Sequence, residues 1–226
     1  MNGNIPITIA IDGPSASGKS TVGELLAKRL GYLYFDTGVM YRAVTSVAMR
    51  RGIPLTDEQR VSEMARKLQI DVLPATVNDG RQNTILADGE DITQELRSGD
   101  IDANVSLVSS YPQVREAMVE RQRQIASRGR VVMIGRDIGT VVLPGADLKI
   151  YLDGTVECRA ERRFKENRAR GDQTAYDEVL RLMKRRDELD MGRVTSPLRP
   201  APDARIVDTT TLSVREVLKA IEDHWK

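Results

Sequence analysis

One short segment constrains the fold of this chain more than any other feature. Residues 13–20, GPSASGKS, match the pattern G-x-x-x-x-G-K-[ST] at every fixed position. The segment follows a β-branched apolar run at 7–11, which predicts a buried strand, and precedes a helix predicted from about Lys19 to Leu30. Glycines let the backbone curl so that successive N–H groups face a phosphate chain, and the helix N-terminus adds positive potential. The strand–loop–helix context therefore predicts a P-loop that binds a nucleoside triphosphate.

The polar positions of this loop have distinct chemical roles. Lys19 is of the right length to reach the β- and γ-phosphates, and the Ser20 hydroxyl is a ligand for Mg²⁺. The predicted triphosphate-binding residues are Gly13, Pro14, Ser15, Ala16, Ser17, Gly18, Lys19, Ser20 and Thr21. A glycine-rich turn that matches by chance is the alternative, and the flanking strand and helix argue against it. The loop alone does not identify the molecule that accepts the phosphoryl group.

The rest of the chain alternates strand and helix patterns. A second helix is predicted after residues 36–38, and Pro112 begins a long predicted helix that ends at Gly129. Further predicted strands occupy residues 32–35, 130–134, 148–152 and 204–208. This rhythm predicts an α/β fold, with a parallel five-stranded sheet covered by helices on both faces.

Two helix starts carry the signature of a capping box, a hydroxyl residue followed three positions later by Glu or Gln. These pairs are Thr56 with Gln59 and Ser213 with Glu216. The C-terminal helix that Ser213 opens carries the only histidine, His224, and the only tryptophan, Trp225, both predicted to have no role in chemistry.

The pattern changes between residues 68 and 106. Its first half consists of short runs broken at 78–80, NDG, and followed by Asp88-Gly89, which is typical of hairpin turns. We therefore predict a small α+β insert at 68–106, containing antiparallel strands, inside a core formed by 1–67 and 107–226.

Composition narrows the partners and the compartment. The net charge of +1 and the few aromatic residues argue against a general nucleic-acid binder. No apolar run approaches the roughly 18 residues of a membrane span, and the N-terminus lacks the pattern of a signal peptide. A single cysteine, Cys158, fits a reducing compartment. We expect a cytoplasmic protein without a membrane or nucleic-acid partner.

Four segments, taken in order, resemble bacterial cytidylate kinases, which are P-loop nucleoside monophosphate kinases. They are IDGPSASGKST at 11–21, FDTGVMYRA at 35–43, GRDIGTVV at 135–142 and RDELDMGR at 186–193. The P-loop alone is generic, whereas the ordered set is specific and extends over nearly the whole chain. The resemblance implies a monomer that transfers the γ-phosphoryl group of ATP to CMP, and to dCMP, with Mg²⁺ as cofactor. It also implies that the insert binds the acceptor.

The resemblance also implies an acceptor site. In the family, three arginines bind the acceptor phosphate, a carboxylate with an arginine and a serine reads cytosine, and an Asp–Arg pair holds the ribose. The guanidinium offers a planar fork of donors that suits phosphate oxygens. The three arginines are Arg42, Arg136 and Arg193; the cytosine group is Asp137, Arg115 and Ser106; the ribose pair is Asp190 and Arg186.

Asp36 and Thr37 join this predicted CMP site because they follow a strand, and ligands of open α/β sheets bind at the carboxyl edge. Asp36 is a candidate to orient a water on the metal. A cap or turn hydroxyl remains the alternative for Thr37 and for Ser106.

Arginines gather between residues 159 and 170, in a segment that resembles the mobile lid of this kinase group at about 157–172. Cationic donors that close over a transferring phosphoryl group stabilise its dispersed charge. The alternative is a solvated helix, because glutamates are interleaved at helical spacing. With Arg162 and Arg163 from this lid, the predicted catalytic set is Lys19, Arg42, Arg136, Arg193, Arg162 and Arg163.

Two other functions stay open. The first is a P-loop kinase for another monophosphate, UMP or AMP, and Asp137 argues for cytosine because a carboxylate accepts from its amine but repels the uracil carbonyl. The second is a regulatory module that binds ATP, against which the clustered arginines argue because they favour a second anionic substrate.

Overall fold

The computed structural model describes residues 5–223, so His224 and Trp225 lie outside the described residues. The chain divides into two compact units. Unit 1 comprises Met1–Tyr32 and Gly129–Lys226, and unit 2 comprises Leu33–Arg128. Within residues 5–223, no helix has both the length and the apolar character needed to cross a bilayer.

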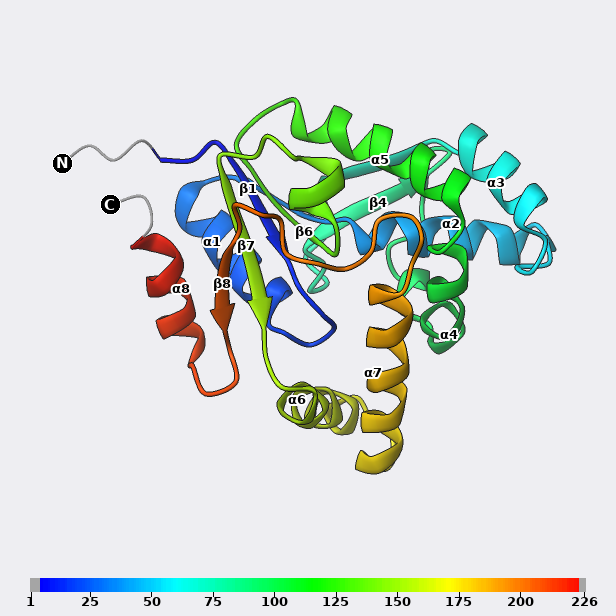
Figure 1. The fold of residues 1–226 in the computed structure, drawn as a ribbon. Helices are drawn as coiled ribbons and strands as arrows, with labels where there is room; N and C mark the ends of the chain where they lie inside the picture. The colour runs from blue at the N-terminus through cyan, green and yellow to red at the C-terminus, as the bar shows by residue number, and fades with distance from the viewer. Residues whose placement is uncertain (1–4, 224–226) are drawn as a thin grey trace. The chain divides into compact units, whose positions relative to one another are not determined.

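A five-stranded parallel sheet has the strand order β2-β6-β1-β7-β8 (Figure 1). The strands are β1 (Thr8–Asp12), β2 (Leu33–Asp36), β6 (Val131–Gly135), β7 (Leu148–Asp153) and β8 (Arg205–Asp208). In unit 1 the central strand β1 pairs in parallel with β6 and β7, which places Asp12 beside Gly135 and Tyr151. The carboxyl ends of these three strands therefore meet at one edge. The predicted α/β fold is confirmed.

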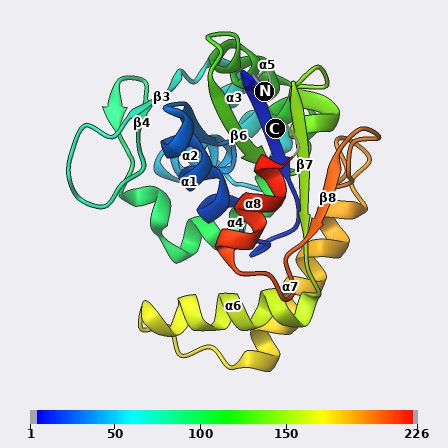
Figure 2. The ribbon, with the colours of Figure 1, turned by 90° about the vertical axis from the view of Figure 1, so that its left-hand side faces the viewer.

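Unit 1 contains the helices α1 (Lys19–Leu30), α6 (Val156–Ala169), α7 (Tyr176–Met191) and α8 (Val214–Glu222), and a π-helical turn, η2 (Ile138–Val142). Helix α1 follows Gly18 (φ 95°) and ends at Gly31, whose left-handed φ of 66° confirms the predicted glycine stop. Figure 2 shows α8 beside α1, where Arg29 and Glu222 form an ion pair.

Helices α6 and α7 pack against each other around a small apolar cluster of their own. Ala160, Val179 and Met183 are buried in it, and the rings of Phe164 and Tyr176 meet edge to face with centroids 6.0 Å apart. Ala16 of the phosphate loop also packs against this cluster. The arginine-rich segment is therefore one half of a helical hairpin that contacts the loop, and the other half is α7.

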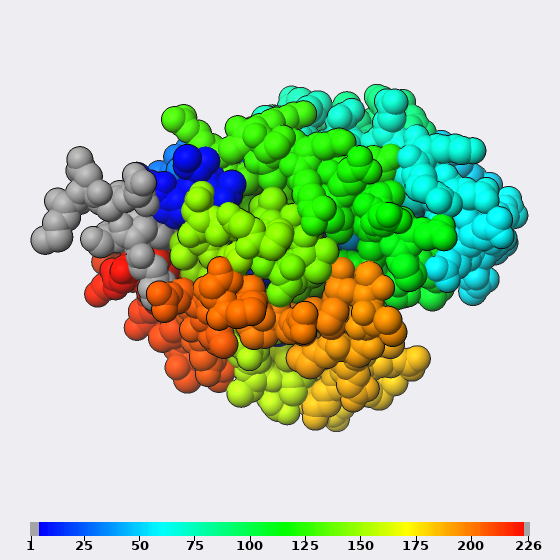
Figure 3. Space-filling view, turned by 45° about the horizontal axis from the view of Figure 1, so that its top comes forward, coloured from blue at the N-terminus to red at the C-terminus, as the bar shows by residue number. Residues whose placement is uncertain are grey.

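Residues 192–204 connect α7 to β8 and run over the surface of unit 1, where they are orange in Figure 3. The connection is fixed at two points. The Leu198 N–H donates to the Asp190 carbonyl at 2.9 Å, and Lys149 of β7 pairs with Asp203 at 2.8 Å. The segment that carries Arg193 is thus held against the sheet.

Unit 2 contains the helices α2 (Gly38–Arg50), α3 (Glu58–Lys67), α4 (Gly99–Val108) and α5 (Pro112–Ala126), and the short turn η1 (Glu95–Arg97). Its second sheet has three antiparallel strands, β3 (Ile70–Pro74), β4 (Asn83–Ala87) and β5 (Glu90–Asp91). Asp88 (φ 48°) and Gly89 (φ 85°) form the two-residue turn between the last two strands. The expected antiparallel strands are therefore present, whereas the insert boundaries at 68 and 106 stay a prediction.

The two predicted capping boxes have different outcomes. Ser213 accepts from the Glu216 N–H while the Glu216 carboxylate accepts from the Ser213 N–H, so this box is confirmed. The box at Thr56 is wrong, because helix α3 begins one residue later and Asp57 accepts from the Arg60 N–H at 3.1 Å. A carboxylate is as good a cap as a hydroxyl, and the two candidates are adjacent.

Replacing Ser213 with alanine is expected to lower the free energy of unfolding by about 1 kcal/mol, because the first turn of α8 loses its cap. A denaturant titration measures this, with an unchanged slope and a lower midpoint. The matched control is Ser127→Ala, at the C-terminus of α5, where the hydroxyl caps no N–H group. Equal losses in the two variants would contradict the role of the cap.

Candidate active site

The backbone of the phosphate loop depends on glycine at its first position. Gly13 has a φ of 148°, and a Cβ there would lie 2.0 Å from the carbonyl oxygen of Leu152 in β7. No side chain fits that space. Ala16, at the tip of the loop, also has a left-handed φ of 57°. The loop therefore holds an unusual curled backbone between β1 and α1, as the sequence predicts.

Lys19 lies within the curl of this loop. The residue is only 7% exposed, and its ammonium group donates to the Pro14 carbonyl at 2.6 Å and to the Ser17 hydroxyl at 3.4 Å. Ser20 and Thr21 follow on the first turn of α1, where both are exposed. A positive charge and the N–H groups of a helix start thus face the same region, which suits a phosphate chain.

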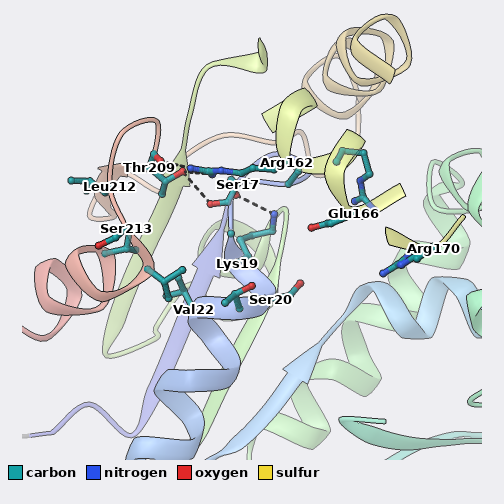
Figure 4. Close-up of a pocket in the computed structure, with 16 residues that line it drawn as sticks. Ser17, Lys19, Ser20, Val22, Arg162, Glu166, Arg170, Thr209, Leu212 and Ser213 are labelled. Carbon is teal, nitrogen blue, oxygen red and sulfur yellow. Dashed lines mark hydrogen bonds and ion pairs between the residues drawn. The ribbon is translucent and has the colours of Figure 1, made fainter. Parts of the chain in front are cut away.

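A cavity of about 490 Å³ lies beside the loop (Figure 4). The loop, helix α6 and the segment from Thr209 to Val217 form its walls. It is lined by Ala16, Ser17, Gly18, Lys19, Ser20, Thr21, Val22, Arg162, Arg163, Glu166, Arg170, Thr209, Leu212, Ser213, Val214 and Val217. Six of the predicted loop residues, 16–21, line this cavity, whereas the described residues Gly13, Pro14 and Ser15 lie outside the lining.

The two predicted lid arginines reach the cavity from α6. Arg162 donates from Nη1 to the Thr209 hydroxyl at 3.0 Å and from Nη2 to the Thr209 carbonyl. Arg163 donates to the Ser15 hydroxyl at 3.4 Å and pairs with Glu166 at 3.2 Å. Both guanidinium groups therefore lie close to the phosphate loop, and the cavity lining includes four cationic residues, Lys19, Arg162, Arg163 and Arg170.

Thr209 has no role in the sequence-based prediction, yet it joins several parts of this site. Its buried hydroxyl lies 2.7 Å from the Asp153 carbonyl and 3.2 Å from the Ser17 carbonyl, in addition to accepting from Arg162. One side chain thus links the ends of β7 and β8 to the phosphate loop and to α6. A threonine just after an apolar strand carries no signal that would distinguish it from an ordinary turn hydroxyl.

A buried ion pair also lies outside the predicted set. Arg159 of α6, only 4% exposed, binds both carboxylate oxygens of Asp187 in α7, the shorter contact being 2.6 Å. Its remaining donors reach the Gly154 carbonyl at 2.8 Å and the Ser15 carbonyl at 3.2 Å. This guanidinium thus joins the two helices of the hairpin to the phosphate loop, with charge-assisted hydrogen bonds to one carboxylate and two carbonyl groups.

Two arginines of the predicted acceptor site bind a carboxylate that belongs to the same predicted site. Asp190, 2% exposed, accepts from Arg136 at 2.9 Å and from Arg193 at 2.5 Å. Burial works to raise the pKa of Asp190, but Arg136, Arg193 and Arg186 together lower it below the ordinary value. The carboxylate therefore stays ionised near neutral pH and holds two of the arginines that were predicted to bind phosphate.

Asp12 and Asp137 are two further buried carboxylates at the ends of β1 and β6. Asp12 accepts from the N–H groups of Ile138 at 2.8 Å and Gly139 at 2.7 Å. Burial raises the pKa of Asp12 from 3.8 to about 6, although these two hydrogen bonds oppose the shift, and the charge of Asp137 adds to it. Asp137 was predicted from the sequence and Asp12 was not.

Three residues of the predicted CMP site, Arg42, Asp36 and Thr37, lie in unit 2 at or near the start of α2. Arg42 of α2 pairs with Asp102 of α4 at 2.5 Å and donates to the Leu96 carbonyl at 3.1 Å. Asp36 accepts from the Gly38 N–H at 2.9 Å, which fixes the entry to α2, and Thr37 is the buried residue between them.

Arg115 of α5 is 2% exposed, with its guanidinium 5.3 Å from the ring centroid of Tyr41. It donates to the Ser109 carbonyl at 3.1 Å. Ser106 is half-buried on α4, and its carbonyl accepts from the Ser109 hydroxyl at 3.2 Å. The predicted pair Ser106 and Arg115 therefore meets through one turn at the end of α4.

Comparison with known proteins adds independent information. The family model described as cytidylate kinase matches residues 9–226 of the chain. A protein of Herpetosiphon aurantiacus named cytidylate kinase is 51% identical over 96% of this chain and 93% of its own length. One of Bacillus subtilis with the same name is 44% identical over 96% of both chains.

Among solved structures, an uncharacterised protein of Eubacterium ventriosum aligns with 96% of this chain and 97% of its own, with a TM-score of 0.53 and 12% identity. At that identity the likeness concerns the fold alone.

Proposed function

The chain belongs to the cytidylate kinase family, and on that premise we propose that it transfers the γ-phosphoryl group of ATP to CMP, and to dCMP, giving CDP or dCDP. The observation that carries the proposal is the cavity beside the phosphate loop, which we call the donor cavity. There the ammonium group of Lys19 and the guanidinium groups of Arg162 and Arg163 gather at one phosphate loop. Three cations at such a loop suit a reaction whose transition state carries dispersed negative charge.

ATP occupies the donor cavity in this proposal. Its phosphates lie along the backbone of residues 13–18 and at the start of α1. Leu212, Val214 and Val217 supply an apolar wall for the flat base. Arg162 and Arg163 bind the phosphoryl group during its transfer. For this, Arg162 exchanges its contact with Thr209, and Arg163 its contact with Ser15, for a phosphate oxygen.

Mg²⁺ accompanies ATP in this proposal, and the donor set fits it. Magnesium is typically held by one or two protein oxygens together with phosphate oxygens and waters. Ser20, exposed at the first turn of α1 and lining the cavity, supplies such an oxygen. Among residues 5–223, three or more His, Cys, Asp or Glu side chains do not gather in a metal-binding group. When bound, the ion neutralises charge on the phosphates.

The acceptor is bound by the residues that the family resemblance assigns. Arg42, Arg136 and Arg193 bind the phosphate of CMP, and Asp190 supports this assignment because it holds two of those arginines close together. The cytosine is read by Asp137, Arg115 and Ser106, the ribose is held by Arg186 and Asp190, and Asp36 and Thr37 complete the group.

Transfer is direct and in line, without a covalent enzyme intermediate. The second pKa of a phosphate monoester is near 6, so the CMP phosphate is largely ionised at pH 7 and needs no strong general base. The chain's contribution is therefore positioning of the two phosphates and stabilisation of charge by Lys19 and the arginines.

Replacing Asp137 with asparagine is expected to narrow the preference for CMP over UMP by about 10–100-fold, because the carboxylate accepts from the cytosine amine and repels the uracil carbonyl. The ratio of kcat/KM for the two monophosphates measures this. Asp71→Asn, which changes an exposed carboxylate on β3, is the matched control. An unchanged ratio in Asp137→Asn would remove this residue from base recognition.

The rival functions are separated by one assay. ADP formation from Mg-ATP is followed with CMP, dCMP, UMP, AMP and GMP added separately, and Lys19→Met serves as the blank. Strong stimulation by CMP and dCMP supports the proposal. Stimulation by UMP or AMP instead keeps the kinase and overturns the cytosine assignment, whereas no stimulation by any monophosphate overturns the kinase in favour of an ATP-binding module.

The same proposal includes a monomer in the cytoplasm. The single cysteine, Cys158, supports a reducing compartment, since disulfides are typical of oxidising ones. The near-neutral charge of the chain gives no support for nucleic acid as a partner.

A further inference from the structure

Asp12 is the last residue of β1 and comes directly before the phosphate loop. The residue is only 3% exposed, and each of its two carboxylate oxygens accepts one backbone N–H, from Ile138 at 2.8 Å and from Gly139 at 2.7 Å. Burying a carboxylate is costly unless it is hydrogen-bonded, and here both partners belong to one short segment. The chain therefore maintains an energetically costly charge, and both of these hydrogen bonds tie β1 to the start of η2.

A second contact joins the same two stretches in the opposite direction. Arg136 donates from Nη1 to the Gly13 carbonyl at 3.1 Å. Asp12 and Gly13 are consecutive, and so are residues 136–139, which we call the acceptor segment because it contains Arg136 and Asp137. Two reciprocal contacts, one through a carboxylate and one through a guanidinium, thus connect the start of the donor-binding loop to the acceptor segment.

We propose that Asp12 is a positioning residue for phosphoryl transfer: its ionised carboxylate fixes the acceptor segment against the start of the phosphate loop. Arg136 and Asp137 then keep a constant geometry relative to the loop that holds the donor. This role rests on the proposed function, because it requires that Arg136 and Asp137 bind the acceptor. Transfer rates are sensitive to small displacements of the reacting groups, so such a contact affects the reaction without touching the substrate.

The contact depends on ionisation. An ionised carboxylate accepts strongly at both oxygens, whereas the hydroxyl oxygen of a protonated carboxyl is a much weaker acceptor, so one of the two hydrogen bonds is weakened on protonation. Because burial raises the pKa of Asp12 to about 6, the contact is complete above that pH and weakens as the pH falls through it.

Charged and titratable groups surround Asp12 on each element that packs there. Lys19 on α1 favours the ionised form, and Asp137 in the acceptor segment opposes it. On β7, burial and then nearby carboxylates raise the pKa of Tyr151 to about 12, so this phenol is neutral near pH 6. Lys149, whose side chain lies next to Gly139, directs its ammonium group to Asp203. Asp12 is thus the group in this set expected to titrate near pH 6.

Asp147 offers a matched control at the other end of the same strand. Its carboxylate accepts from the N–H groups of Ile7 at 2.9 Å and Thr8 at 2.8 Å, but it is exposed and far along β1 from the loop. Hydrogen bonding, chiefly from the Thr8 N–H, lowers the pKa of Asp147 below its ordinary value. Both carboxylates accept two backbone N–H groups, but Asp12 uses both of its oxygens whereas Asp147 accepts through Oδ2 alone, and the two residues differ in burial and in location.

The first test observes the contact in the unaltered protein without substrate. Amide proton shifts of Ile138 and Gly139 are followed by NMR in ¹⁵N-labelled protein between pH 4.5 and 8. Both signals should move together with one midpoint near pH 6, and neither should move in Asp12→Asn. The amides of Ile7 and Thr8 should not titrate in this range. Amides that stay constant, or that titrate equally in the variant, would overturn the contact.

The second test asks whether the contact serves the reaction. Asp12→Asn is expected to lower kcat/KM for CMP by about 10–100-fold, with a smaller fall in the affinity for ATP measured without CMP. Asp147→Asn should lower the midpoint of thermal unfolding while kcat/KM for CMP is retained. Equal kinetic effects in the two variants would reduce Asp12 to a structural role and overturn the proposal. Absence of CMP turnover in the unaltered protein would instead overturn the proposed function, and the amide titration still decides the contact.

Discussion

Replacing Lys19 with methionine is expected to lower kcat for phosphoryl transfer by about 10²–10³-fold, which corresponds to about 3–4 kcal/mol of transition-state stabilisation. The physical reason is the position of the ammonium group, which is buried within the curl of the loop and bound to the Pro14 carbonyl. In such a site a charge is worth more than in water, and it is already oriented before the reaction. Single-turnover kinetics with CMP measure the loss separately from product release.

The matched control is Lys28→Met, the same change on the exposed C-terminal turn of the same helix. It removes a charge of the same kind from α1 without touching the loop, so kcat should be retained. If both variants lose activity alike, the effect belongs to the helix and not to the phosphate loop. The circular dichroism of Lys19→Met should match that of the unaltered chain.

Replacing Asp187 with alanine is expected to lower the free energy of unfolding by about 3–5 kcal/mol, because it leaves the buried charge of Arg159 without its carboxylate. That is a large part of the roughly 5–15 kcal/mol by which a native protein is stable. The pair joins α6 to α7, and the same guanidinium binds the Ser15 carbonyl of the phosphate loop. Denaturant unfolding measures the loss as a lower midpoint.

A double-mutant cycle sharpens this test. Arg159→Met combined with Asp187→Ala removes both charges, so the double variant should be more stable than the sum of the single losses predicts. The control is Glu178→Ala, which breaks an exposed ion pair with Arg181 on the same helix, and its midpoint should stay nearly unchanged. Additive losses in the cycle would show that the two side chains do not act as a pair.

The sequence predicts the fold where local chemistry decides it. Gly31 ends α1 and Ser213 caps α8 because a left-handed turn and an N-cap each require a particular residue type. Helix α4 was not predicted, although Ile101, Val105 and Val108 are buried at helical spacing and Ser98 caps it. Its glycine, aspartates and asparagine are weak helix formers, so burial of one face overrides local propensity there.

The same distinction, between local chemistry and contacts distant in sequence, separates the site residues that the sequence predicts from those that it does not. Lys19 and the glycines of the loop are recognisable because their order in the chain reflects a local geometry. Asp12, Thr209 and Asp187 are not, because their importance arises from burial and from partners that are distant in sequence. Asp12 bonds to residues 126 and 127 positions further along the chain. Burial converts an ordinary carboxylate into a perturbed one, and no spacing rule reports that.

The proposed reaction is the direct transfer of a phosphoryl group from ATP to a cytidine monophosphate. The most direct measurement supplies ATP labelled in its γ-phosphoryl group, Mg²⁺ and an equimolar mixture of CMP, dCMP, UMP, AMP and GMP, and separates the labelled products by chromatography. We expect label in CDP and dCDP, with less in UDP. Label released only as inorganic phosphate, or gathered in the diphosphate of another base, would contradict it.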